Sequence, residues 1–577
     1  MKRYIKYAKP YIKYFILGPV CMIIEVLGEI FLPYLMSVII NEGVANHDIR
    51  FIILLGCIMI GIACIMAGGG IGGAYFASHA SISFGADLRQ DLFEKVQKFS
   101  FRNIDTFSTG SLVTRLTNDI TQVQNIIMMI LRTCLRAPGM LIGALIMAFT
   151  MNSNLAVILL IVIPLLALAI FALMRVAFPR FEIMQKKIDR LNSGIQETLV
   201  NIRVIKSFVR GEYEENKFKN LNEDLCQSSI HAIKIAICSM PVMMLAMNIT
   251  TISVVWFGGN MIIAGNMPVG DLTAFTTYIV QILMSLMMMA MVFLNSSRAL
   301  ASIKRINEVL DTVIDLTDEC AAQPETDVEE GKIEFKHVNF RYYKDTEEWV
   351  LQDINLTILP GQTVGIIGPT GCGKTSLVSL IPRLYDADEG MVCVDGVDVK
   401  DYSLHRLRDG VGMVLQKNVL FSGSIMENLR WGDSDASDEM VFAAAANAQA
   451  DGFVRTFPFQ YGTELGQGGS NVSGGQKQRL CIARALLKKP KILILDDSTS
   501  AVDTATEAKI RETFQTTLNQ TTKIIIAQRI SSVMEADQIL VMEAGKIVGQ
   551  GKHEELMKTC REYKEIYDSQ MNQEVTA

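Results

Sequence analysis

Six long apolar segments occupy the first half of the chain, and they restrict its fold more than any other feature. They cover residues 15–40, 51–76, 126–150, 156–176, 235–264 and 272–294. Each approaches or exceeds the roughly 20 residues that an α-helix needs to cross the hydrocarbon core of a bilayer. The first half is therefore predicted to be an α-helical membrane domain with six transmembrane helices, surrounded by membrane lipid.

The composition changes near position 331, where the chain begins to read as a soluble domain of mixed helices and strands. With 577 residues the chain is also too long for one hydrophobic core. We expect a membrane domain with cytosolic helical extensions over 1–310, a linker over 311–330 and a second domain over 331–577. The net charge of −6 says little about partners, because the two halves differ so much.

Positive charge predicts the orientation in the membrane. Two links between the apolar segments, 77–125 and 177–234, are long, polar and helical in pattern, and they carry many Lys and Arg residues, as does the amino terminus. The short links contain only Arg50. Because cytoplasmic loops are enriched in Lys and Arg, we expect a multi-pass protein of the cell membrane. Its amino terminus, long links and carboxyl-terminal domain would face the cytosol.

Two features inside the apolar segments have more than one interpretation. Glu25 and Glu29 lie four residues apart, hence on one helix face. They either line a cavity or pathway, or they sit near an interface or pair internally with a neighbouring helix. Methionines on the last two segments either form an adaptable apolar binding surface or fill packing gaps. They are Met240, Met243, Met244, Met247, Met284, Met287, Met288, Met289 and Met291.

The second half contains a phosphate-binding pattern. The apolar run 364–367 reads as a buried strand, GPTGCGKT follows at 368–375, and the next residues open a helix. This is G-x-x-x-x-G-K-[ST] in the strand–loop–helix context that it requires. Lys374 would reach the outer phosphates of a nucleotide, Thr375 would help to hold Mg²⁺, and backbone N–H groups would wrap the phosphates. The candidate residues are Gly368, Gly371, Cys372, Gly373, Lys374, Thr375 and Ser376.

Two further motifs follow in the same half. The apolar run ILIL at 492–495 reads as a second buried strand, and it ends at Asp496 and Asp497, where a metal-binding acid is expected. Between the two strands, VSGGQ opens a helix, and a helix N-terminus is physically suited to phosphate. The candidate residues of this second motif are Ser473, Gly474, Gly475 and Gln476.

With these motifs in this order, the chain resembles the ABC transporter ATPases, and its fused membrane half resembles an ABC exporter half-transporter of the multidrug type. The resemblance implies an α/β P-loop NTPase domain that uses ATP and Mg²⁺. VSGGQ resembles the family signature, which contacts the ATP held by the opposing subunit. Tyr342 resembles the aromatic residue that stacks on adenine, and residues 500–503 resemble the D-loop.

The resemblance also implies a metal-binding set and two coupling segments. Gln416 resembles the Q-loop glutamine, which senses Mg²⁺ and touches the membrane domain, so the implied magnesium ligands are Thr375, Gln416 and Asp496. Short coupling helices are expected near 103–107 and 212–218.

Two positions depart from the family pattern. Asp497 stands where hydrolysing members have Glu as the base, and its side chain is one methylene shorter. Gln528 stands where they have a switch histidine, and glutamine cannot carry positive charge to the transition state. A general base must lie within about 2.6–3.2 Å of the proton that it takes. We therefore expect this chain's own site to bind ATP and to hydrolyse it weakly.

These departures, beside a nearly intact signature, favour a heterodimer whose second half-transporter has intact catalytic residues. The expected activity is ATP-driven export of small lipophilic or drug-like compounds. A regulatory ATP-binding subunit, or a lipid or peptide exporter working as a homodimer, remains an alternative. The six membrane spans argue against the soluble ABC proteins of DNA repair or translation, so no nucleic acid partner is expected.

Overall fold

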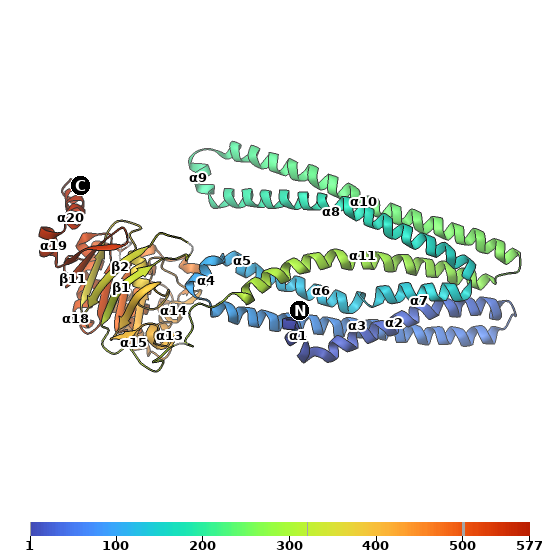
Figure 1. Cartoon of the computed structure of the whole chain (residues 1–577), viewed down its shortest axis with the longest axis horizontal. Coiled ribbons are helices and arrows are strands. Elements are labelled where there is room, and N and C mark those ends of the chain that lie inside the picture. Colours follow the sequence, from blue (N-terminus) through green and yellow to red (C-terminus); the bar gives the residue numbers. More distant parts are fainter. Residues whose placement is uncertain (1, 320, 345, 499–501, 577) are drawn as a thin grey trace. The chain divides into compact units, whose positions relative to one another are not determined.

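The structure is a computed structural model that describes residues 2–319, 321–344, 346–498 and 502–576. The chain divides into two units (Figure 1). Unit 1 comprises Met1–Gln97 and Thr109–Asp311, and unit 2 comprises Lys98–Ser108 and Thr312–Ala577. A short piece of the first long link therefore belongs with the carboxyl-terminal part of the chain.

Unit 1 is built from long helices joined by short turns (Figure 1). Its α-helices are α1 (Lys2–Ala8), α2 (Ile12–Val38), α3 (Ile49–Gln97), α5 (Thr109–Thr114), α6 (Ile120–Thr133), α7 (Arg136–Met151), α8 (Ser153–Val200), α9 (Ile202–Ser207), α10 (Gly211–Ile263) and α11 (Val269–Asp311). Single turns of other helix types are η1 (Lys9–Tyr11), η2 (Ile39–Val44) and η3 (Arg115–Asp119).

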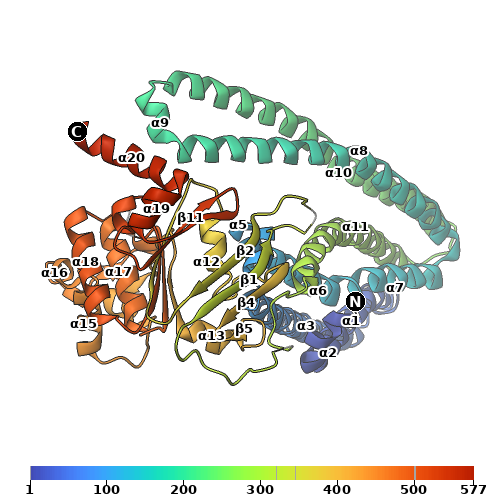
Figure 2. The same ribbon diagram turned by 60° about the vertical axis from the view of Figure 1, so that its left-hand side comes forward.

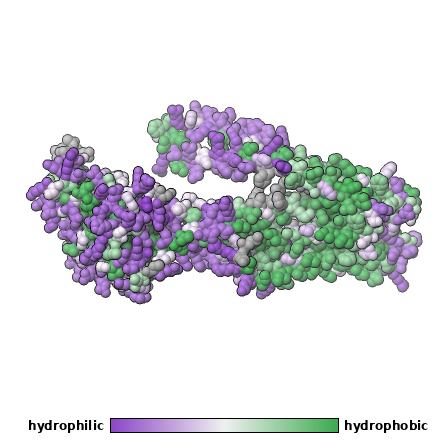
Figure 3. Space-filling view, viewed as in Figure 1, coloured by the Kyte–Doolittle hydropathy of each residue, from purple (hydrophilic) through white to green (hydrophobic). Residues whose placement is uncertain are grey.

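The prediction of six membrane spans is confirmed. In the part of the chain that the structure describes, six helical segments are long and apolar enough to cross a bilayer: Arg3–Val44, Ile49–Gln97, Thr109–Met151, Ser153–Val200, Met244–Ile263 and Val269–Val292. The 49 residues of α3 correspond to about 74 Å of helix, more than twice a hydrocarbon core of ~30 Å. The long links are therefore continuations of the membrane helices. Figure 3 shows hydrophobic side chains over one part of unit 1 and mostly hydrophilic ones along the arm that ends at α9, with hydrophobic ones at the tip of this arm.

The second predicted coupling helix lies at a different place in the chain. Residues 212–218 are inside α10, and the short helix between α8 and α10 is α9 (Ile202–Ser207). The cause is local, because α8 ends at Val200, its C-cap Asn201 has ψ of 16°, and Val209 takes φ of 53° before Gly211 begins α10. The first coupling helix agrees with expectation to within two residues, as α4 (Phe101–Thr106).

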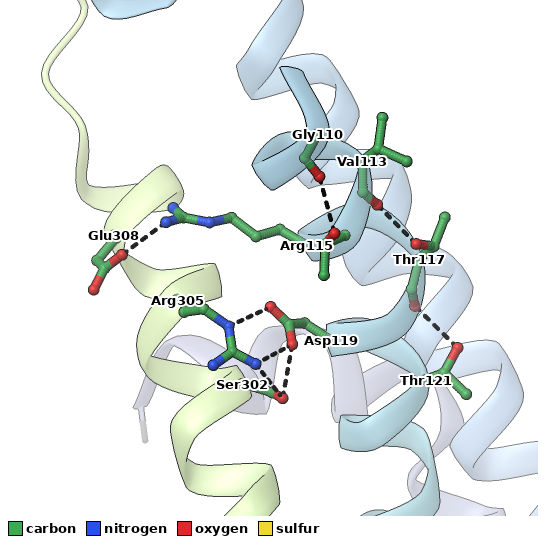
Figure 4. Close-up of polar contacts among 10 residues, drawn as sticks. Gly110, Val113, Arg115, Thr117, Asp119, Thr121, Ser302, Arg305 and Glu308 are labelled. Atoms are coloured by element: carbon green, nitrogen blue, oxygen red, sulfur yellow. Dashed lines mark hydrogen bonds and ion pairs between the residues drawn. The ribbon is translucent and has the colours of Figure 1, made fainter. Parts of the chain in front are cut away.

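Within unit 1, polar contacts join η3 to α11 (Figure 4). Asp119, whose side chain is 3% exposed, accepts hydrogen bonds from Ser302 at 2.9 Å and from Nε of Arg305 at 2.8 Å. One turn away, Arg115 donates to Glu308 at 3.0 Å. A buried carboxylate is stable only when it is paired in this way, so these contacts fix the register of η3 against α11.

Unit 2 is an α/β domain around a six-stranded sheet of order β12-β11-β3-β10-β9-β6. All neighbours in this sheet are parallel except β11 and β12. A four-stranded antiparallel sheet has the order β2-β1-β4-β5, and β7 pairs with β8. The strands are β1 (Ile333–Phe340), β2 (Leu351–Ile358), β3 (Thr363–Ile367), β4 (Glu389–Val394), β5 (Val397–Asp398), β6 (Val411–Val414), β7 (Gly423–Ser424), β8 (Glu464–Leu465), β9 (Ile492–Asp496), β10 (Thr522–Ile526), β11 (Gln538–Glu543) and β12 (Lys546–Gly551).

The helices of unit 2 cover both faces of the six-stranded sheet. The α-helices are α4 (Phe101–Thr106), α12 (Lys374–Ser379), α13 (Leu404–Gly410), α14 (Ile425–Arg430), α15 (Asp438–Asn447), α16 (Asp451–Val454), α17 (Gly474–Leu487), α18 (Thr504–Thr517), α19 (His553–Thr559) and α20 (Arg561–Thr576). Single 3₁₀ turns are η4 (Gln460–Gly462), η5 (Gln467–Gly469) and η6 (Ile530–Ser532).

Successive residues of the parallel strands enter two different hydrophobic cores. Ile492 and Ile494 of β9 join a core with α12 and the antiparallel sheet, whereas Leu493 and Leu495 join a core with α15, α17 and α18. This alternation follows from the two-residue period of a strand. Consequently α12 and α17 pack on opposite faces of the same sheet (Figure 2).

Candidate functional site

The predicted phosphate loop has the backbone that its glycines require. It runs from the end of β3 to α12, with Gly368 at φ of 154° and Gly373 at φ of 98°. A Cβ atom on Gly368 would lie 2.1 Å from the carbonyl oxygen of Met542, and one on Gly373 would lie 2.9 Å from Leu351. Both positions therefore need glycine. The strand–loop–helix arrangement expected from the sequence is observed.

Lys374, the first residue of α12, folds back over the loop. Its Nζ atom donates to the carbonyl oxygens of Gly368 and Pro369, each at 2.8 Å. The buried thiol of Cys372 lies 3.8 Å from the same nitrogen. An ammonium held over a loop of glycines with positive φ is suited to binding the outer phosphates of a nucleotide.

Two of the three predicted magnesium ligands meet directly. The Thr375 hydroxyl donates to Oδ1 of Asp496 at 3.1 Å, and Asp496 is 2% exposed. Its other oxygen, Oδ2, is buried and has no hydrogen-bond partner among the described residues. Burial raises the pKa of Asp496, and the hydrogen bond from Thr375 opposes that shift. An orphaned carboxylate oxygen beside a hydroxyl fits Mg²⁺, which prefers oxygen ligands.

Gln416 lies at the same edge of the sheet. It follows β6, whose last residue Val414 is paired with Leu495, the residue before Asp496. Its side chain is exposed. Among the described residues no three His, Cys, Asp or Glu side chains converge as a metal site. A cation at this edge would therefore be held by the mixed set Thr375, Gln416 and Asp496, together with phosphate oxygens.

The two residues that depart from the family pattern contact each other. Nε2 of Gln528 donates to Oδ2 of Asp497 at 2.6 Å. Asp497 has φ of 48°, and its N–H donates to the carbonyl oxygen of Ile526 at 3.0 Å. The end of β9 is thereby tied to the end of β10, and the shortened carboxylate is oriented toward the glutamine.

The predicted adenine-stacking residue is joined to the phosphate loop. The hydroxyl of Tyr342 lies 2.8 Å from Oγ of Ser376, and its ring packs edge-on against Phe340 and Tyr385. Burial raises the pKa of Tyr342, so its hydroxyl remains protonated at neutral pH. The structure thus brings together two candidates that are 34 residues apart in the chain.

The helix α4 braces Tyr342 from its backbone side, a role that sequence reasoning missed. Arg102 donates to the carbonyl oxygens of Arg341 and Tyr342, both at 3.1 Å. Asp105 accepts from the hydroxyl of Tyr385 at 2.8 Å. These contacts also explain why this short piece of the first link belongs to unit 2.

The signature motif forms the start of α17. Ser473 is the N-cap and accepts from the N–H of Gln476, while Gln476 accepts from the N–H of Ser473 at 2.9 Å. This capping box uses two N–H groups, and Ser473 and Gly474 are exposed to solvent. Because α12 and α17 cover opposite faces of the sheet, the signature begins on the face away from this chain's phosphate loop.

Of the predicted D-loop, Ser500 and Ala501 lie outside the described residues. Val502 is buried, and Asp503 is the N-cap of α18, where its side chain accepts from the N–H of Thr506 at 2.9 Å.

A second candidate site lies inside unit 1. A cavity of about 640 Å³, called the membrane cavity below, is lined by α2, α6, the first turn of α7 and α11. Its walls include Met284, Met287, Met288 and Met291, four of the methionines singled out from the sequence. Two arginines also line it, Arg132 and Arg136.

The carboxylates of Glu25 and Glu29 are paired inside unit 1. Oε1 of each lies near Nη2 of Arg136, at 3.2 Å for Glu25 and 2.6 Å for Glu29. Of the two interpretations left open by the sequence, internal pairing is the one observed. Sequence reasoning missed Arg132 and Arg136, although charged residues inside an apolar segment are the same signal that singled out the glutamates.

Comparison with known proteins places both halves in one family. Residues 15–286 match the family described as ABC transporter transmembrane region, and residues 351–500 match the family described as ABC transporter. The uncharacterized ABC transporter ATP-binding protein YfiB of Bacillus subtilis is 40% identical over 100% of this chain and 99% of its own length.

Two relatives have names that state a substrate. An ATP-dependent lipid A-core flippase of Syntrophus aciditrophicus is 31% identical over 99% of this chain and 95% of its own length. A fatty acid ABC transporter ATP-binding/permease protein of Mycobacterium bovis is 35% identical over 82% of this chain and 74% of its own length. The structure of a bacterial Atm1-family ABC exporter with ATP bound has the same fold, with a TM-score of 0.80 and 24% sequence identity. The match covers 97% of this chain and 98% of that chain.

Proposed function

The chain belongs to the ABC transporter family, and we propose that it is the exporter subunit whose own ATP site is catalytically weak. Its signature would complete a strong ATP site on a different partner chain. The observation that carries this proposal is the Gln528–Asp497 hydrogen bond at 2.6 Å, beside a fully formed signature cap on α17.

ATP binding at the chain's own site is supported by the geometry of the phosphate loop. Lys374 and the loop N–H groups would bind the phosphates, and Tyr342 would contact the adenine. Thr375, Gln416 and Asp496 would hold Mg²⁺, which supplies neutralising charge to the β- and γ-phosphates.

Hydrolysis at this site would be slow for two chemical reasons. The carboxylate of Asp497 is one methylene short of the family's base and accepts a hydrogen bond from the Gln528 amide. The carboxylate oxygen that accepts from the amide must give up this hydrogen bond before it can accept one from an attacking water. The glutamine itself can donate a hydrogen bond, but it cannot become a cation as the transition state gains negative charge.

A second chain is supported by features of both units. In unit 2, the signature and the phosphate loop are on opposite faces of one sheet, so one copy cannot use both on the same ATP. In unit 1, the α8–α10 pair ends at α9 away from α11 (Figures 1 and 2), with Phe208 73% and Val209 88% exposed. Large apolar side chains at a polar helix end indicate a surface that a partner covers.

We propose a lipophilic substrate. The lipid and fatty-acid names of two relatives support this class, as does a cavity lined mainly by apolar side chains. This lipophilic class includes drug-like compounds. A cavity lined by methionines can accept them, because methionine side chains adapt to many ligand shapes.

The amino terminus, long links and unit 2 are proposed to be cytosolic, on the distribution of Lys and Arg. In a cysteine-free background, Asn266→Cys should react with an impermeant maleimide on intact cells, and Asn220→Cys should react only after lysis. Both positions are exposed. The reverse labelling pattern would overturn the orientation.

The heterodimer is tested by ATPase rate. The chain alone should bind Mg·ATP and turn it over slowly, and co-purification with its partner should raise the rate at least ~10-fold, within the range of a general-base contribution. In the assembled pair, Asp497→Asn should keep most of the activity, whereas the same change at the partner's base should remove it. If Asp497→Asn is as damaging as the partner's change, Asp497 is a working base and the homodimer becomes the better reading.

A further inference from the structure

The membrane cavity of unit 1 carries chemistry that ATP binding does not use. Its volume of about 640 Å³ is typical of small-molecule sites. Seven methionines line it: Met22 from α2, Met128 and Met129 from α6, and four from α11. Thioether side chains are flexible and polarisable, so this wall can adapt to an alkyl chain of varying path.

The charged groups in the lining all have one sign. Arg132 and Arg136 line the cavity, and no Asp or Glu does so among the described residues. Arg132 is exposed and forms no ion pair within the described part of the chain. A ligand in this cavity therefore meets guanidinium groups, which bind carboxylate and phosphate oxygens through paired N–H donors.

Glu25 and Glu29 offset the charge of Arg136, so Arg132 is the lining cation that forms no ion pair within the described part of the chain. Both carboxylates contact one nitrogen of Arg136, Nη2, and their second oxygens are buried without a hydrogen-bond partner among the described residues. Neither residue belongs to the cavity wall. Their ion pairs fix the position of Arg136 through its Nη2 atom, while its Nε atom is buried without a hydrogen-bond partner among those residues. The glutamates thus position one arginine rather than offer a site for a cation.

The arginines lie at a depth that suits an amphiphile. Arg136 is the first residue of α7, which runs to Met151 at a short link. Fifteen residues of helix span about 22 Å, and the hydrocarbon core is ~30 Å thick. Arg136 is therefore closer to the boundary on the side of the long links than to the short link. A head group at this level would remain near the membrane interface while its chain contacts the methionines.

We propose that the membrane cavity binds amphiphiles with one anionic head group, a carboxylate or a phosphate, on a flexible alkyl chain. The head group lies between Arg132 and Arg136, and the alkyl chain packs on the methionine wall. This inference rests on the proposed export function and names its substrate class. It excludes the cationic lipophiles that intramembrane glutamates would otherwise suggest.

The test is equilibrium binding to the full chain, alone and with its partner, in nonionic detergent without nucleotide. Three probes share one alkyl chain: dodecanoate, dodecyl phosphate and dodecyltrimethylammonium. Calorimetric titration should show that at least one of the two anions binds ~10-fold or more tightly than the ammonium probe. A hydrogen bond to a charged group changes the binding affinity by about this factor. Preference for dodecanoate would indicate fatty acids, and preference for dodecyl phosphate would indicate phospholipids.

Variants of one arginine separate charge from folding. Arg132→Gln should weaken anion binding about 10-fold or more, Arg132→Lys should retain most of it, and Arg132→Glu should favour the ammonium probe. Arg180→Gln is the matched control, because Arg180 is an exposed residue of α8 outside the cavity, and it should change nothing. Equal affinity for all three probes, or equal behaviour of Arg132→Gln and Arg180→Gln, would overturn the proposal.

The two proposals fail in different ways. Binding is measured without ATP, so it does not depend on hydrolysis at either site. Anion binding without ATP-driven transport by the assembled pair would support the cavity assignment and count against export. Transport of dodecyltrimethylammonium without anion binding would leave export standing and overturn the cavity assignment.

Discussion

The two faces of the six-stranded sheet in unit 2 differ in how complete their ATP chemistry is. On the face of α12, the phosphate loop and Asp496 are fully formed, but the two positions proposed for catalysis at the sheet edge carry Asp497 and Gln528. On the face of α17, the signature cap has both of its reciprocal hydrogen bonds. The roles proposed above therefore assign binding and catalysis to different side chains within one domain.

The largest expected effect comes from the signature face. Gly475→Asp places a carboxylate in the first turn of α17, where a phosphate of the partner's ATP is proposed to bind. ATPase activity of the assembled pair should fall by ~10²–10³-fold, the range for losing one donor to a transition-state anion. Gly452→Asp is the control, because a Cβ there meets no atom within 4 Å. Retention of most activity in Gly475→Asp would remove the distinction between the two faces.

The second prediction concerns the proposed catalytic positions on the side of the phosphate loop. The double change Asp497→Glu and Gln528→His lengthens the base and adds a group that can carry positive charge. ATP hydrolysis by this chain should rise by ~10–10²-fold, as general acid–base groups contribute. Gln528→His alone serves as the control, since the base remains short, and should give a much smaller gain. No gain in the double variant would contradict the proposal that Asp497 and Gln528 limit hydrolysis at this site.

Lys374→Ala tests binding separately from catalysis. The change removes the ammonium that lies 2.8 Å from two loop carbonyls. Affinity for a fluorescent ATP analogue should fall by at least ~10-fold, because a charge-assisted contact to phosphate is lost. Lys509→Ala changes an exposed lysine of α18 and should leave affinity unaltered. Equal affinities in the two variants would contradict the assignment of the phosphate loop.

Tyr342→Phe should have the smallest effect. It removes the hydroxyl that lies 2.8 Å from Ser376 but keeps the ring for the adenine. One neutral hydrogen bond contributes about 0.5–1.5 kcal/mol, so ATP affinity should fall by less than ~10-fold in the same fluorescence titration. Tyr342→Ala should cost more, because it also removes the ring. If the two variants are equivalent, the ring does not contact the base.

Much of this architecture was predictable because its signals are local. The six spans depend on runs of apolar residues, and the phosphate loop depends on glycines whose spacing sets a backbone shape. The short helix after α8 was misplaced because a single residue, Asn201, ends α8 earlier than the family resemblance implies. The two arginines of the membrane cavity lie inside the apolar segment 126–150, but their grouping with methionines of α2 and α11 depends on helices far away in the chain.

The sequence by itself determined the membrane class, the two-part organisation and the residue types at each ATP motif, since these follow from hydropathy and short-range spacing. The tertiary structure alone decided which side chains meet. It paired Asp497 with Gln528, set Arg136 against Glu25 and Glu29, and placed the signature and the phosphate loop on opposite faces of one sheet. The physical reason is that such contacts join residues tens to hundreds of positions apart, and only packing of whole elements brings their atoms within hydrogen-bond distance.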